Sequence, residues 1–418
     1  MSVSQSFTIY NKNKHPKELL VVDDDLPEEI SNIIGHINLF IRRAHRINID
    51  FVDVSDNTIH LLCYRLVNSL YNYKKKSMEK LDKIYVSGKK ITELPNFNLA
   101  NNILEAMRLN DSPSNVVNST IFLKHITKHL PKNVELSVFD RTNLTRNGFG
   151  GILGVNTGSS NEPLLIILKY KNTNVDPTII VGKGVMFDAG GNNIKRGDFS
   201  DMKIDKCGAV YTYTLIKTLA ENNVPGHFMG FLPLVENVIG RASIKPGDVI
   251  SLYDKTTIEI KDTDAEGRII LADVLSYIKR HIKAKLIIDI ATLTGQASYF
   301  FGNIGTAIMH NKPASSIIEP LINIGDMNTE FFWKIRLHNV YKKYLKSDVA
   351  DLKNHNRENS AGVIFSGLFL KHFVDSKTPW IHFDIAGVAY KKHSTGEPLY
   401  SLYQYLTEIE TLLSKTNS

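Results

Sequence analysis

Continuous apolar runs alternate with amphipathic stretches from about residue 110 onward, and this alternation predicts an α/β domain. Four runs have the length and content of buried strands: "PLLIILKY" (163–170), "PTIIVGKGVMFD" (177–188), "HFMGFLPLV" (227–235) and "AKLIIDIATLTG" (284–295). Helical spacing of apolar positions predicts helices in "KCGAVYTYTLIKTLAENN" (206–223) and "DAEGRIILADVLSYIKRHI" (264–282). Buried strands of an α/β sheet typically read as continuous apolar runs of this kind.

The first 95 residues contain shorter elements and no recognisable chemical motif. Strands are predicted at "LLVVDDD" (19–25) and "KIYVSG" (83–88), and an amphipathic helix at "LPEEISNIIGHINLFIRRAHRI" (26–47). The stretch "NFNLANNILEAMRLNDSPSN" (96–115) predicts a helix that a Ser-Pro-Ser breaker ends. We therefore expect an N-terminal α/β domain over 1–95, a linker helix over 96–112 and a larger domain over 113–418.

Composition agrees with a soluble protein of two domains. The chain has 418 residues, of which 43% are hydrophobic and 22% charged. Its two cysteines, Cys63 and Cys207, argue against a disulfide framework and suit a reducing compartment. The first twenty residues lack the apolar core of a signal peptide, and no apolar run reaches the ~18 residues of a membrane span. We expect a cytoplasmic protein that does not enter a membrane.

The positive charge of the chain permits nucleic-acid contact but does not favour it. The formal net charge is +7, yet lysine and arginine are spread along the sequence. The densest basic patches are "YKKKSMEK" (73–80), "KHITKH" (124–129) and "KRHIKAK" (279–285). No helix-turn-helix, zinc-finger or RNA-recognition signature accompanies them, so a solvated helix face is the simpler interpretation of each.

Acidic groups gather where predicted strands and helices meet. The segment "DTDAEGR" (262–268) places three carboxylates and an arginine between the strand-like "TTIEI" and an apolar helix. Five charged groups lie at strand ends or turns: Lys183, Asp188, Asp205, Asp264 and Glu266. Oxygen-rich clusters suit divalent ions, and two ions that share bridging carboxylates would explain so many acids. Aspartates are also common at helix caps and solvated turns, and spacing alone leaves both interpretations open.

Read in order, these segments resemble the leucyl aminopeptidase family, peptidase family M17. The resemblance rests on "VGKGVMFDAGGNNIK", "DMKIDKCGA", "DTDAEGRIILADVL" and "DIATLTG", with "SDVADLKN", "SAGVIFSGLFLKHFV" and "PWIHFDIAG" following. It covers roughly residues 100 to 410. It implies a C-terminal catalytic domain with a central mixed β-sheet flanked by helices. An α/β N-terminal domain, shorter than is usual in the family, precedes it.

The resemblance also implies a two-metal centre. It assigns as ligands Lys183, Asp188, Asp205, Asp264 and Glu266. Asp188 and Glu266 would bridge the ions, which are usually zinc, with manganese or magnesium able to replace zinc at one site. Lys183 can act as a ligand only as a neutral amine, so nearby dications and burial must depress its pKa. We expect Asp262, where the family usually has asparagine, to cap the turn; an extra ligand is the alternative.

Lys195 and Arg268 are the catalytic residues that the resemblance implies. Lys195 would stabilise negative charge on the scissile carbonyl oxygen. Arg268 would hold a bicarbonate ion as the proton relay, because a guanidinium can bind a planar anion through two hydrogen bonds. The implied substrate contacts are Met202, Thr292 and Gly295 in the first side-chain pocket and the backbone carbonyl of Leu293.

The predicted function is a metal-dependent aminopeptidase that acts on peptides with a free N-terminus and prefers leucine and other apolar residues. A homohexamer is the assembly that the resemblance implies. Two alternatives remain: a DNA-binding protein on the same fold, and a two-metal phosphatase or nuclease. Enzymes of the second kind rarely use a lysine ligand, so Lys183 in "VGKG" argues against them.

Overall fold

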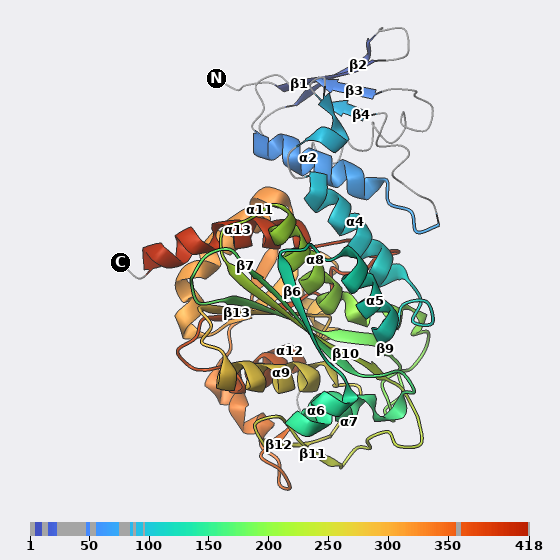
Figure 1. Ribbon diagram of the computed structural model, residues 1–418, viewed down its shortest axis with the longest axis vertical. Helices are drawn as coiled ribbons and strands as arrows, with labels where there is room; N and C mark the ends of the chain where they lie inside the picture. The colour runs from blue at the N-terminus through green and yellow to red at the C-terminus, as the bar shows by residue number, and fades with distance from the viewer. Residues whose placement is uncertain are drawn as a thin grey trace. The chain divides into compact units, whose positions relative to one another are not determined.

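The chain forms two compact units, which Figure 1 shows in a computed structural model. The structure describes residues 5–10, 16–22, 47–50, 56–74, 84–86, 89–94, 97–356 and 361–416. The first unit comprises residues 1–108 with 327–329, and the second comprises 109–326 with 330–418. The amphipathic helix expected at 26–47 and most of the basic patch at 73–80 lie outside the described residues.

The first unit contains a five-stranded sheet in the order β2-β1-β3-β4-β5. Its strands are β1 (Gln5–Tyr10), β2 (Pro16–Val22), β3 (Ile47–Asp50), β4 (Ile84–Val86) and β5 (Lys89–Lys90). The strands predicted at 19–25 and 83–88 correspond to β2 and β4. The helices are α2 (Asp56–Ser69) and α4 (Phe97–Asp111), and α4 is the helix predicted from residue 96 onward.

A nine-stranded mixed sheet forms the centre of the second unit. Its main path is β15-β14-β17-β13-β8-β10-β7-β6, and β9 pairs with β10. The bounds are β6 (Val134–Phe139), β7 (Leu164–Lys171), β8 (Thr178–Gly182), β9 (Gly184–Asp188), β10 (His227–Asn237), β13 (Leu286–Ala291), β14 (Thr306–His310), β15 (Phe332–Lys334) and β17 (Trp380–Asp384). Strands β17, β13, β8 and β10 are mutually parallel, whereas β14, β7 and β6 join by antiparallel pairing. The predicted α/β class with a mixed sheet is confirmed.

Helices cover both faces of this sheet (Figure 1). Helix α8 (Cys207–Glu221) packs on β8, β10 and β13, and α13 (Leu399–Thr416) packs against α8. Helices α7 (Gly150–Val155), α9 (Gly267–His281) and α12 (Gly362–His372) pack together with the sheet, as the contacts of α7 and α9 with β10 show. Every residue of α8 from Cys207 to Ala220 is buried, including three threonines and Lys217.

The other elements of the second unit are shorter. They are the helices α5 (Ser119–His129), α6 (Arg141–Asn147), α10 (Gln296–Phe301) and α11 (Ile318–Asn328, which continues into the first unit), and the strands β11 (Val249–Ser251), β12 (Thr257–Glu259) and β16 (Leu352–Lys353). Short 3-10 helices occupy Asn156–Gly158, Ser200–Lys206 (η3), Lys312–Ile317 and Asn339–Leu345, and one in the first unit occupies Ile91–Glu93. No helix in the described part of the chain has the length and apolar content needed to cross a membrane.

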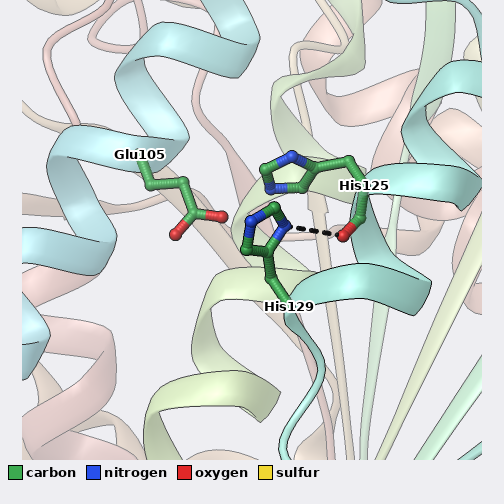
Figure 2. A group of neighbouring side chains, drawn as sticks. All are labelled: Glu105, His125 and His129. Atoms are coloured by element: carbon green, nitrogen blue, oxygen red, sulfur yellow. Dashed lines mark hydrogen bonds between the residues drawn. The ribbon is translucent and has the colours of Figure 1, made fainter.

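The basic patch at 124–129 is a solvated helix face. Helix α5 buries Phe122 and Ile126 and exposes Lys128 and His129. Figure 2 shows the imidazoles of His125 and His129 beside each other, with ring centroids 4.3 Å apart. The Nδ1 atom of His129 lies 2.9 Å from the carbonyl oxygen of His125, a hydrogen bond within the helix.

The patch at 279–285 is likewise exposed at the end of a helix. Lys279, Arg280 and His281 form the last turn of α9, and all three are exposed. Cations at a helix C-terminus interact favourably with its unpaired carbonyl groups. Both patches therefore have a structural explanation that needs no nucleic-acid partner.

Asp273 links helix α9 to helix α7 and to the turn at Tyr253. It is fully buried in α9, and its carboxylate accepts the backbone N–H of Ile152 in α7 at 2.9 Å and of Tyr253 at 2.7 Å. Burial raises the pKa of the Asp273 carboxyl to about 7. The side chain thus accepts hydrogen bonds from two backbone groups of different segments.

We predict that Asp273→Ala lowers the free energy of unfolding by about 2–4 kcal/mol, because two buried backbone donors lose their acceptor. Urea denaturation measures this change. The control is Glu319→Ala, which removes a surface ion pair with Lys334 and should cost at most about 1 kcal/mol. Equal losses in the two variants would contradict the bracing role of Asp273.

Candidate metal centre

A cluster of ionised groups lies where the parallel strands of the large sheet end. Lys183 directly follows β8, and Asp188 is the last residue of β9. The 3-10 helix η3 contributes Asp205, and the loop before α9 contributes Asp264 and Glu266. Ligand sites of α/β proteins form at this carboxyl edge because loops and helix N-termini converge there.

Lys183 lies at the buried end of the cluster. Its Nζ is 2.8 Å from Asp205 Oδ2 and 3.0 Å from Glu266 Oε1, and it donates a hydrogen bond to the carbonyl oxygen of Thr292 at 2.9 Å. Burial by itself would lower the pKa of Lys183, but the charges of Asp205, Glu266 and Asp188 raise it above its ordinary value. The neighbouring carboxylates therefore outweigh burial and keep this amine protonated, so the depressed pKa expected for a ligand would require the charge of bound ions.

Close approach of α9 holds Lys183 in place. A Cβ atom on Gly267 would lie 2.4 Å from Cε and 2.7 Å from Nζ of Lys183. Only glycine therefore lets the first turn of α9 pack on the lysine side chain. The glycine of "DAEGR" is explained in this fold by its contact with the Lys183 side chain.

Lys195 lies at the more open side of the cluster. Its Nζ is 2.7 Å from Asp188 Oδ2 and 2.5 Å from Asp264 Oδ1, and its side chain is 20% exposed. Burial lowers the pKa of Lys195, but Asp188, Glu266 and Asp264 outweigh it and raise the pKa above the ordinary value. Lys195 is therefore a protonated cation that solvent can reach.

Four carboxylates share the space with these two ammonium groups. One oxygen from each of Asp188, Asp264 and Glu266 lies within 4.8 Å of the others. Burial, together with neighbouring acids, raises the pKa of Asp205 and of Asp264 to about 7. Asp205 Oδ2 is paired with Lys183 and Asp264 Oδ1 with Lys195, and among the described residues no other donor contacts these two oxygens. Four carboxylates beside two ammonium groups carry an excess of negative charge, and each carboxylate oxygen can accept more than one contact, so the donor set fits divalent cations.

Asn237 belongs to the cluster, although the sequence did not single it out. It ends β10, and its Nδ2 donates to Asp188 Oδ1 at 2.8 Å, to the Thr263 carbonyl at 2.9 Å and to Glu266 Oε2 at 3.3 Å. It thus contacts both carboxylates that the resemblance assigns as bridging. The predicted strand stopped at residue 235, two positions short of the edge where Asn237 lies.

A second asparagine fixes the acidic loop. Asn354 Oδ1 accepts the backbone N–H of Lys261 at 2.8 Å, and its Nδ2 donates to the carbonyl of Asp262 at 2.6 Å. Asp262 Oδ1 accepts the backbone N–H of Asp264 at 3.0 Å, which is the turn-capping role expected for it. The loop therefore presents Asp264 and Glu266 from a backbone that is held on both sides.

Arg268 is a buried guanidinium with unused donors. Its side chain lies in the first turn of α9, and Nη1 donates to the Asn354 carbonyl at 2.9 Å. Nε has no partner in the described part of the chain, and the Phe365 ring centroid lies 5.6 Å from Cζ. Burial lowers the pKa of Arg268 to about 10. A cation with free N–H groups in a buried setting suits a small anion.

Of the residues expected to contact substrate, Thr292 contacts the cluster directly. Thr292 follows β13, and its Oγ1 donates to Asp205 Oδ1 at 2.7 Å. The side chain of Leu293 packs on the main core, and Met202 in η3 is partly buried. A Cβ atom on Gly295 would meet no atom within 4 Å, so this residue borders open space.

Arrangements of this kind, with buried acids and lysines at the carboxyl edge of an α/β sheet, are typical of metal-dependent hydrolases. The family model "Cytosol aminopeptidase family, catalytic domain" matches residues 105–403. The chain belongs to this family, the peptidase family M17 that the sequence resembles.

Individual relatives agree with this assignment. The "Probable cytosol aminopeptidase" of Cenarchaeum symbiosum (strain A) is 39% identical over 273 residues, which cover 65% of this chain and 55% of that protein. The chain thus spans little more than half the length of this curated relative. The solved structure "Bottromycin maturation enzyme BotP in complex with Mn" is similar with a TM-score of 0.84 and 25% identity, covering 98% of this chain and 93% of the other. A cytosol aminopeptidase structure from Coxiella burnetii has a TM-score of 0.81 and 28% identity, with 96% and 88% covered.

We predict that Lys183→Met destabilises the protein by about 3–5 kcal/mol in the presence of a chelator, because Asp205 and Glu266 lose their buried counter-charge. Denaturation in urea with EDTA measures the loss. Lys169→Met is the matched control, since Lys169 pairs with Glu135 at the surface, and it should cost at most about 1 kcal/mol. If the two substitutions lower the free energy of unfolding equally, the cluster does not depend on Lys183 for its charge balance.

Proposed function

We propose that this protein is a metal-dependent aminopeptidase that hydrolyses the N-terminal residue, leucine or another apolar residue, from peptides with a free α-amino group. The observation that carries the proposal is the convergence of Lys183 and Lys195 with four carboxylates at one buried point. Membership of the cytosol aminopeptidase family supports the same reaction. A phosphatase or nuclease would need no lysine enclosed among its ligands.

The proposed metal ligands are Lys183, Asp188, Asp205, Asp264 and Glu266, which would hold two divalent ions, with Asp188 and Glu266 bridging. Ions bound there supply a water of lowered pKa and a Lewis acid for the substrate amine. Zinc is the proposed metal, with manganese or magnesium able to replace it at one site. The Mn named for the similar BotP structure supports a site that accepts manganese.

The chain's own residues would divide the remaining tasks. The Lys195 ammonium stabilises the negative charge that develops on the scissile carbonyl oxygen. Arg268, whose Nε has no partner in the described part of the chain, would hold the bicarbonate ion, which would supply the proton acceptor. The Leu293 carbonyl orients the substrate amine, and Met202, Thr292 and Gly295 line the pocket for the first side chain. The homohexamer implied by the resemblance is part of the same proposal, and analytical ultracentrifugation measures it.

The proposal predicts that cleavage requires a free N-terminus, because the α-amino group must reach the metal centre. The test compares leucyl-p-nitroanilide with N-acetyl-leucyl-p-nitroanilide, using protein reconstituted separately with zinc, manganese and magnesium. We expect turnover of the free amine only. Comparable cleavage of the acetylated reporter would show that the amine is not anchored, and absence of turnover with every metal would contradict the activity itself.

Substitutions of Lys183 and Lys195 should affect different properties, metal binding for the first and turnover for the second. Lys183→Ala removes a proposed ligand, so activity should need a higher metal concentration. Lys195→Ala should leave metal occupancy nearly unchanged and lower kcat by about 100- to 1000-fold, the scale of losing one oxyanion donor. Metal titration and steady-state kinetics on both variants measure the difference. The roles are misassigned if Lys195→Ala loses its metals while Lys183→Ala keeps them.

A further inference from the structure

Asp384 is a buried carboxylate near the centre that has no part in the proposed ligand set. It is the last residue of β17 and is 1% exposed. Its Oδ1 accepts the backbone N–H of Leu293 at 3.1 Å and of Ala386 at 3.2 Å. Its Oδ2 accepts the backbone N–H of Thr294 at 3.1 Å and the Thr294 hydroxyl at 2.6 Å. One carboxylate thus fixes the backbone that follows two neighbouring strands, β13 and β17.

The segment that Asp384 holds is anchored to the metal cluster on its other side. The Thr292 carbonyl accepts from Lys183 Nζ at 2.9 Å, and the Thr292 hydroxyl donates to Asp205 at 2.7 Å. Residues 292–294 are therefore held by hydrogen bonds at both ends: Thr292 bonds to Lys183 and Asp205, and Thr294 bonds to Asp384. Loss of either anchor would change where the carbonyl of Leu293 lies.

We propose that Asp384 is a positioning residue for substrate recognition. By accepting the N–H groups of Leu293 and Thr294, it fixes the direction of the Leu293 carbonyl, which orients the substrate amine, and the start of the pocket wall at Gly295. The inference rests on the proposed aminopeptidase function. A brace between β13 and β17 with no effect on substrate is the alternative to be tested.

The sheet offers a matched control in Asp289. This aspartate lies in β13, is fully buried, and accepts hydrogen bonds from Trp380 Nε1 at 2.6 Å and from His382 Nδ1. It also joins β13 to β17, but within the described part of the chain its side chain makes no hydrogen bond to residues 292–295. Asp289→Asn thus perturbs the same strand pair without touching the segment.

The experiment compares Asp384→Asn with Asp289→Asn and the wild type, each loaded with Mn²⁺. In Asp384→Asn an NH₂ group replaces one acceptor oxygen, so at least one donor of the segment is left unpaired. We expect KM for leucyl-p-nitroanilide and Ki for the product L-leucine to rise together by about 10- to 100-fold. The Mn²⁺ dissociation constant, measured by electron paramagnetic resonance, should stay within about threefold of wild type, and kcat should fall less than KM rises. Asp289→Asn should lower the thermal midpoint without raising KM or Ki.

The outcomes separate this inference from the function on which it rests. If the wild type neither turns over the reporter nor binds L-leucine, the proposed function fails. If the wild type is active and Asp384→Asn changes KM and Ki no more than Asp289→Asn does, Asp384 is only a brace. Loss of Mn²⁺ binding in Asp384→Asn would likewise overturn the positioning role. Should Asp384→Asn not fold, Thr294→Val removes only the 2.6 Å hydroxyl bond and should raise KM and Ki by about 3- to 10-fold.

Discussion

The site in the second unit depends on the balance between four clustered carboxylates, three of them buried, and two ammonium groups. Asp188 and Glu266 repel each other at this distance, and Lys183 and Lys195 offset that repulsion from opposite sides. The six charged groups keep these distances only where rigid elements converge and fix their positions. The parallel run β17-β13-β8-β10 supplies that place, because its strands all end at one edge. The sheet is therefore the scaffold for a charge arrangement that loops alone could not hold.

Tight packing around the cluster follows from the same constraint. A Cβ atom on Gly208, in the first turn of α8, would lie 2.1 Å from the Ile290 carbonyl and 2.7 Å from the Lys183 backbone nitrogen. Helix α8 thus approaches β8 and β13 through a glycine, as α9 approaches Lys183 through Gly267. Both helices direct their N-termini, which carry partial positive charge, toward the acids. Close packing through the glycines and attraction between the helix N-termini and the acids therefore favour the same placement of α8 and of α9.

Sequence reasoning found the elements and charged residues that periodicity and motif order reveal. The strand predicted over 177–188 is divided at Lys183 into β8 and β9, and the helix predicted over 264–282 begins as α9 at Gly267. Lys183 and Glu266 follow from the motifs at these elements. It assigned no role to Asn237, Asn354 or Asp384, although the last two lie in the quoted segments "SDVADLKN" and "PWIHFDIAG", because a single polar residue at a strand end or in a loop has no spacing pattern. Their role arises only when the fold brings them against residues 26 to 92 positions away in the chain. Long-range hydrogen bonding is the part of the site that local pattern does not encode.

The two lysines differ in enclosure, and on the proposed function this difference decides their roles. Cations that bind the four carboxylates compete with both ammonium groups for the same oxygens. Lys195 is 20% exposed and can move toward solvent while it keeps its proton. Lys183 is 4% exposed and is covered by Gly267, so it has no such route and must either exclude the cation or lose its proton and ligate. Burial thus separates a lysine suited to be a neutral ligand from one suited to remain a charged group beside the substrate.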